Sequence, residues 1–167
     1  MNNLGPHSRN LRLNRLKDAP AVFFITKSLW PKKPALDAEA RAVVVSAFRH
    51  AVAHDRITLA AFVVMSDHWH GLFALSVNWT LPKFMHDLMS FVGAKTHSIV
   101  KRWQTAWEDG YHDTRIKSWR QFNYMRDYIN QNPVRKGLAQ RPEDWDAIGI
   151  RETDIICQHW PWGFEEE

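Results

Sequence analysis

The chain has 167 residues, of which 45% are hydrophobic, enough for one domain with a sizeable core and short extensions. It has no run of about 18 apolar residues, which excludes a membrane-spanning helix, and no apolar stretch typical of a secretory signal. Its single cysteine, Cys157, excludes an internal disulfide and a cysteine-based zinc finger. Together these features favour a cytoplasmic protein. The net charge of +4 is unevenly distributed, because residues 1–138 carry 20 basic and 10 acidic side chains, whereas residues 139–167 carry 2 basic and 8 acidic side chains. The basic excess of residues 1–138 indicates either a polyanionic partner or an ordinary solvated basic surface.

Apolar periodicity predicts seven elements after a basic, loosely structured arm at residues 1–20. Asp37 is a candidate N-cap of the first helix, and the short link at Asp67 predicts that the second and third strands pair as a hairpin. In chain order, we expect a strand at 22–26, a helix at 37–54, strands at 57–66 and 68–75, a helix at about 78–102, a strand at 111–116 and a helix at about 118–131.

The first six predicted elements match a ferredoxin-like, split βαβ fold of the α+β class. Such a fold has a mainly antiparallel sheet with helices packed on one face, to which this chain adds a C-terminal helix. We expect three parts: the arm at 1–20, a catalytic domain at 21–138 and an acidic extension at 139–167.

Two histidines flank one tryptophan in the third predicted strand, as His68-Trp69-His70. Side chains at i and i+2 of a strand point to the same face, so the two imidazoles should project together and Trp69 should point the other way. Paired imidazoles on a strand can bind a divalent metal. Taken alone, the pattern is more often two ordinary polar residues at a strand end.

A second motif runs from Asp127 to Leu138 at the end of the last predicted helix. Tyr124, Tyr128 and Asn132 lie at i, i+4 and i+8 and should form one polar-aromatic stripe. Pro133 should end the helix at Asn132, and Gly137 suits a tight turn. The apolar stripe of this helix consists of Phe122, Met125 and Ile129.

The His-hydrophobic-His strand followed by Asp-Tyr-Ile-x-x-Asn-Pro-Val-x-x-Gly resembles the single-tyrosine HUH transposase superfamily, and most closely the REP-associated tyrosine transposases. The resemblance covers about residues 22–138. It implies a metal-dependent nuclease and strand-transferase that acts on single-stranded DNA near small hairpins through a 5′-phosphotyrosine intermediate.

Carried over by residue, the resemblance implies that His68, His70 and Asn132 bind Mg²⁺ or Mn²⁺ and that Tyr128 is the nucleophile. Mn²⁺ suits a mixed imidazole and carboxamide set better than Mg²⁺ does. A phenol is a weak nucleophile at neutral pH, so a bound cation would help by polarising the scissile phosphate. Tyr124 is the reserve nucleophile, and His112 is a candidate for a supporting role near the site.

Basic side chains around these motifs are candidates for phosphate contacts, although each one alone could be a solvated surface charge. The candidates are Lys101, Arg102, Arg115, Arg120, Arg126, Arg135 and Lys136. Two alternatives remain open: a relative that binds structured nucleic acid without cutting it, and an unrelated metal-dependent hydrolase that needs neither Tyr128 nor DNA. The sequence leaves open whether the protein is a monomer or a homodimer.

Overall fold

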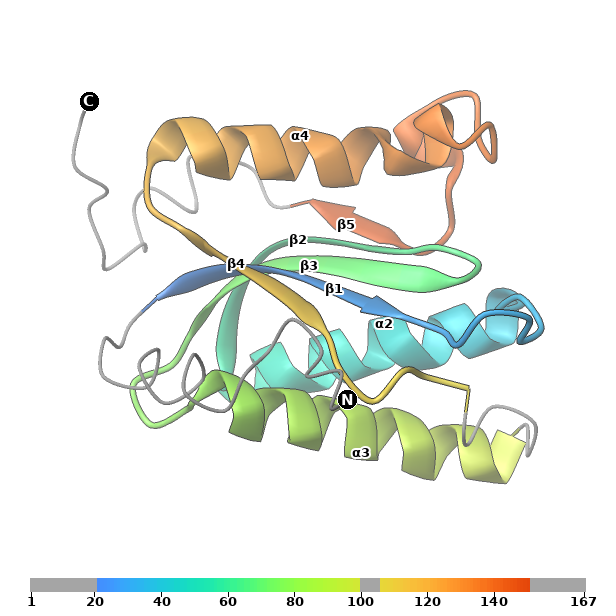
Figure 1. The fold of residues 1–167 in the computed structure, drawn as a ribbon, viewed down its shortest axis with the longest axis horizontal. Coiled ribbons are helices and arrows are strands. Elements are labelled where there is room, and N and C mark those ends of the chain that lie inside the picture. The colour runs from blue at the N-terminus through green and yellow to red at the C-terminus, as the bar shows by residue number, and fades with distance from the viewer. Residues whose placement is uncertain (1–20, 100–105, 151–167) are drawn as a thin grey trace, which may run out of the picture.

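A five-stranded antiparallel sheet forms the centre of the computed structural model, which describes residues 21–99 and 106–150 (Figure 1). The strand order is β4-β1-β3-β2-β5, and β3 therefore pairs with both β1 and β2. This arrangement confirms the predicted α+β class and the hairpin at Asp67. The strands are β1 (Val22–Ser28), β2 (Ile57–Val64), β3 (His68–Leu75), β4 (His112–Ile116) and β5 (Ile148–Ile150).

Helices cover both faces of the sheet (Figure 1). Helices α2 (Ala38–Ala53) and α3 (Leu81–Ile99) lie on one face, as the split βαβ prediction expects, and α4 (Trp119–Arg135) lies on the other. In the two ranges that the structure describes, no helix combines the length and apolar character that a membrane crossing requires.

The period-two alternation of the strands divides the core between these two faces. Phe23, Ile25, Trp69 and Phe73 are buried with the apolar side chains of α2 and α3. The intervening residues of the same strands pack with α4, whose Phe122 and Ile129 are fully buried. The predicted apolar stripe of α4 therefore holds the helix against the sheet, with the half-buried Met125 at its margin.

Side-chain caps fix where two of the helices begin. Asp37 accepts a hydrogen bond from the backbone N–H of Ala40 at 2.9 Å, which confirms it as the N-cap of α2. Ser118 accepts one from the N–H of Gln121 and caps α4 in the same way. The cap at Asp37 was predicted from the sequence, whereas the cap at Ser118 was not.

The end of α4 differs from the prediction, because the helix continues through Pro133 to Arg135. Proline lacks the N–H for one helical hydrogen bond, but only the last turn follows it. The helix stops at Gly137, whose φ of +68° is the left-handed conformation of a helix C′ residue. The N–H of Leu138 donates to the carbonyl of Pro133 and that of Gly137 to the carbonyl of Val134, which together form a Schellman motif.

The first part of the segment expected as an acidic extension lies on the sheet. β5 pairs with β2, and the indole N–H of Trp145 donates to the carbonyl of Val64 at 2.9 Å. A side chain at Gly149 would collide with Phe62, since a Cβ there would lie 2.4 Å from its ring. Residues 148–150 are thus the outer strand of the sheet, while the arm at 1–20 and residues 151–167 lie outside the described residues.

Candidate active site

His68 and His70 project together from the beginning of β3, on the face that α4 covers. Their Nε2 atoms are 3.1 Å apart, and the ring centroids are 4.6 Å apart. Trp69 points to the opposite face, where it is fully buried against Phe48. The structure therefore brings the imidazoles together as the strand alternation predicts.

Each imidazole is oriented by a second polar group. The Nδ1 of His68 lies 2.6 Å from the carboxylate of Asp67, which can accept its N–H. The Nδ1 of His70 lies 2.8 Å from the hydroxyl of Thr26, which can donate or accept. Both Nε2 atoms can therefore offer lone pairs to a shared ligand.

Burial favours the neutral form of His70. The side chain is 4% exposed, and this desolvation lowers the pKa of its imidazole to about 3, with the nearby His68 as the second cause. Asp67 acts in the opposite direction, and Lys136 lowers the pKa further. A neutral imidazole is the form that binds a metal ion.

The aromatic surroundings of His70 fix its ring. Phe24 stacks on it with 5.2 Å between ring centroids, and Tyr128 packs edge-on with 5.3 Å. Phe24 also contacts Tyr128, and the guanidinium of Arg135 lies 5.9 Å from the Tyr128 ring centroid. The phenol ring of Tyr128 is thus held directly beside the histidine pair.

Asn132 lies one helical turn after Tyr128 and is almost fully buried, with 3% of its surface exposed. Its Oδ1 is buried and has no hydrogen-bond partner. An unpaired buried acceptor costs about 1–3 kcal/mol, so such groups are uncommon in stable folds. The unpaired oxygen on the Tyr128 face of α4 fits a metal ligand.

The donor set as a whole suits a divalent cation. Two imidazole nitrogens and one carboxamide oxygen are borderline and hard ligands, a combination that favours Mn²⁺ over Mg²⁺. Within residues 21–99 and 106–150, no cluster of three or more His, Cys, Asp or Glu side chains could hold a metal. The buried Oδ1 of Asn132 is therefore the candidate for a third protein ligand.

Tyr124 does not share the environment of Tyr128. Its side chain is 64% exposed, whereas Tyr128 is half-buried and Asn132 is buried. The predicted stripe therefore runs from solvent into the protein interior along α4, and Tyr124 lies at its outer end. His112 is exposed and pairs with Thr26 across β1 and β4, which places it on the same sheet face as His70.

The candidate phosphate contacts are spread over the molecule. Arg135 and Lys136 lie at the end of α4 that adjoins the histidines, whereas Arg120 is exposed at its other end. Arg126 forms an ion pair with Asp127 at 3.3 Å.

Arg115 lies opposite Phe23 in the register between β4 and β1, and so faces the side of α3. Lys101 and Arg102 lie outside the described residues.

Thr26 and Phe24 contact the histidine pair but were not predicted from the sequence. Both lie on β1, and Thr26 is adjacent to His70 only because of the antiparallel register between β1 and β3. The polar Thr26 after the continuous apolar run 22–25 was the only local signal.

A family model described as "Transposase IS200 like" matches residues 24–132, well over half of the chain. The solved structure of a REP-associated tyrosine transposase bound to a REP hairpin aligns with a TM-score of 0.65 and 16% identity, covering 88% of this chain and 85% of that one. A protein from Deinococcus radiodurans R1 described as a transposase aligns with a TM-score of 0.52 and 16% identity, covering 67% and 90%. No curated protein matches the chain by sequence.

Proposed function

Because the chain belongs to the family of IS200-like transposases, we propose that it cleaves and rejoins single-stranded DNA near hairpins, with Tyr128 as the nucleophile. The observation that carries the proposal is the packing of the Tyr128 ring 5.3 Å from that of His70, with Asn132 one turn later on the same helix. Hairpin DNA as substrate is further supported by the REP hairpin in the similar solved structure.

His68, His70 and Asn132 would hold the divalent cation through two Nε2 atoms and Oδ1. When bound, a divalent cation supplies charge to neutralise the scissile phosphate. Asp67 and Thr26 would keep the two imidazoles oriented through their Nδ1 atoms. Phe24 excludes water from one face of His70.

In the cleavage step, the phenolic oxygen of Tyr128 attacks phosphorus in line with the bond to the 3′ oxygen. A P–O bond to the tyrosine forms, the P–O3′ bond breaks, the phenolic proton passes to solvent and the leaving 3′ oxygen takes up a proton. The fixed ring contributes by positioning, which can supply several kcal/mol of the barrier. A 3′-hydroxyl from another strand can reverse the step and join the DNA.

A denaturing gel for a protein–DNA adduct tests the assignment. The purified full chain is incubated with Mn²⁺ and single-stranded oligonucleotides that carry a hairpin, and we expect an adduct that survives denaturation. Tyr128→Phe should abolish the adduct, while Tyr124→Phe, at the exposed tyrosine of the same helix, should retain it. An adduct formed by Tyr128→Phe would refute the assignment. Salt-dependent binding without any adduct would favour the non-cleaving relative.

A further inference from the structure

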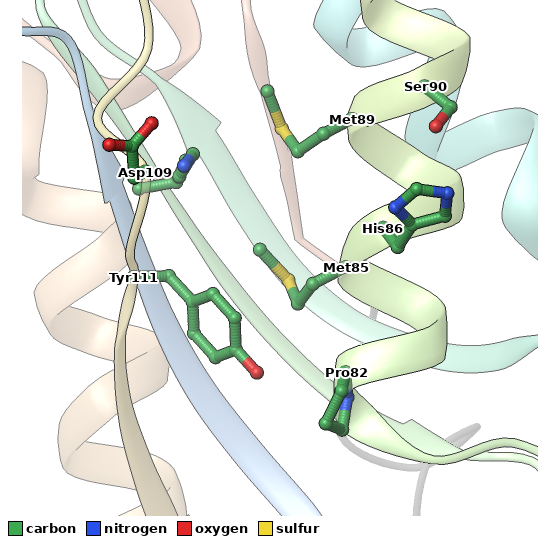
Figure 2. Close-up of a pocket in the computed structure, with 8 residues that line it drawn as sticks. Pro82, Met85, His86, Met89, Ser90, Asp109 and Tyr111 are labelled. Atoms are coloured by element: carbon green, nitrogen blue, oxygen red, sulfur yellow. The ribbon is translucent and has the colours of Figure 1, made fainter. Parts of the chain in front are cut away.

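A cavity of about 460 Å³ lies on the opposite face of the sheet from the histidine pair, between α3 and the segment that leads into β4. Its volume is within the range of about 300–1,000 Å³ typical of small-ligand sites. Figure 2 shows the Tyr111 ring extending toward Pro82 and Met85 of α3, with Met89 one turn farther along the helix. Lys27, His86, Ser90 and Asp109 complete the lining.

Lys27 forms a fixed polar end of this cavity. The residue is 5% exposed, and its ammonium donates to the carbonyls of Glu108 and Gly110, the latter at 2.8 Å. Burial lowers the pKa of the amine, while the charges of Asp109 and Glu108 oppose that shift. The two carbonyl bonds hold the segment with Asp109 and Tyr111 in place beside β1.

The lining excludes two classes of ligand. An anion such as phosphate would meet the carboxylate of Asp109, and the Lys27 ammonium already donates to two carbonyls. A wholly apolar ligand would leave the third N–H of the Lys27 ammonium without a partner. A planar ring with a polar edge fits both the apolar and the polar end of the cavity. Its faces can contact Tyr111, Met85 and Met89, and its edge can contact Lys27 and Asp109.

The strand alternation connects this cavity to the catalytic face. Thr26 contacts His70, while its neighbour Lys27 lines the cavity. His112 faces the catalytic side as the first residue of β4, while its neighbour Tyr111 lines the cavity. A single strand of DNA that passes over this edge of the sheet could therefore reach both faces within a few nucleotides.

We propose that this cavity binds one unpaired nucleobase of the DNA strand that carries the scissile phosphate. The inference rests on the proposed function for the identity of the substrate. The base would stack on Tyr111 between the thioethers of α3 and present its polar edge to Lys27 and Asp109. The cavity would thus hold the strand by a base, independently of the metal and Tyr128.

Photocrosslinking tests the site without a mutation. The full chain is irradiated in EDTA with a single-stranded 12-mer of 5-iododeoxyuridine, and the modified peptides are identified by mass spectrometry. We expect an adduct on Tyr111, Met85 or Met89. Adducts confined to other residues would overturn the proposal.

An affinity comparison tests stacking. We expect Tyr111→Leu to reduce the preference for a thymidine 12-mer over an abasic 12-mer by about fivefold or more, which corresponds to the lower limit of a base–aromatic stack. Phe91→Leu removes an aromatic ring from α3 outside the cavity and should leave the preference unchanged. An equal loss of affinity for both oligonucleotides in Tyr111→Leu would contradict a base site.

The two proposals fail separately. A Tyr128 adduct without cavity crosslinks would overturn the base site alone. Cavity crosslinks without a Tyr128 adduct would overturn the cleavage mechanism alone.

Discussion

Replacing Asn132 by leucine tests whether its buried carboxamide binds a metal or supports the fold. The Oδ1 atom is buried without a partner, and an unpaired acceptor costs about 1–3 kcal/mol. Leucine has a similar size and no such acceptor. We therefore expect Asn132→Leu to leave the free energy of unfolding without metal unchanged, or to raise it by up to about 3 kcal/mol.

The increase in the free energy of unfolding on adding Mn²⁺ should be smaller in Asn132→Leu than in the wild-type protein. At a Mn²⁺ concentration 100 times its Kd, binding stabilises the wild-type protein by about 2.7 kcal/mol. Outer-shell mutations weaken metal binding by about 10–100-fold, so the loss of a direct ligand should reach at least the upper value. A 100-fold weaker Kd would reduce the stabilisation at that concentration to about 0.4 kcal/mol.

Urea unfolding in EDTA and in Mn²⁺ measures both quantities, and the chain offers a matched control. The Oδ1 of Asn123, also on α4, is likewise buried without a partner. Asn123→Leu should therefore keep the full Mn²⁺ response. Asn132→Asp should also keep it, but should lower the free energy of unfolding in EDTA because it buries a carboxylate.

One pattern would refute this reasoning. If Asn132→Leu lowered the free energy of unfolding in EDTA and retained the 2.7 kcal/mol response, Asn132 would be a structural residue, and the third ligand would have to be sought elsewhere.

Further predictions concern the supports of the site. Thr26→Val should weaken Mn²⁺ binding by about 10–100-fold and Thr26→Ser should restore it; equal calorimetric affinities in the two variants would contradict an orienting role. Gly137→Ala should lower the free energy of unfolding by about 1–2 kcal/mol, because its φ is +68°; an unchanged urea midpoint would show that the turn relaxes. Arg135→Ala and Lys136→Ala should each reduce the slope of log K against log salt for single-stranded DNA by about 0.7, measured by anisotropy, and an unchanged slope would exclude a phosphate contact.

Local patterns were sufficient to predict most of the fold. The cap at Asp37 depends only on the residue and on the helix that follows it. The projection of His68 and His70 to one face depends only on strand alternation. Strand β5 could not be predicted, since three residues in an acidic segment show no periodicity and the strand exists only through its pairing with β2.

Features that depend on tertiary packing were missed. Thr26 meets His70 across 44 positions of sequence, through a register that no local pattern specifies. Residues four apart on a helix are offset by about 40°, so the stripe from Tyr124 to Asn132 turns through about 80°. The burial of Phe122 and Ile129 sets the rotation of α4, which buries Asn132 and exposes Tyr124.

The placement of the site follows from how its elements are anchored. His68 and His70 belong to β3, which pairs with strands on both sides and is fixed by the fully buried Trp69 and Leu72. Tyr128 and Asn132 belong to a helix that the buried Phe122 and Ile129 fix against the sheet. The polar groups of the site therefore need not contribute stability themselves, and one of them, the Oδ1 of Asn132, is unpaired in the protein alone. Anchoring by apolar neighbours allows such a group to persist in a rigid position, which is what the proposed metal and nucleophile site would require.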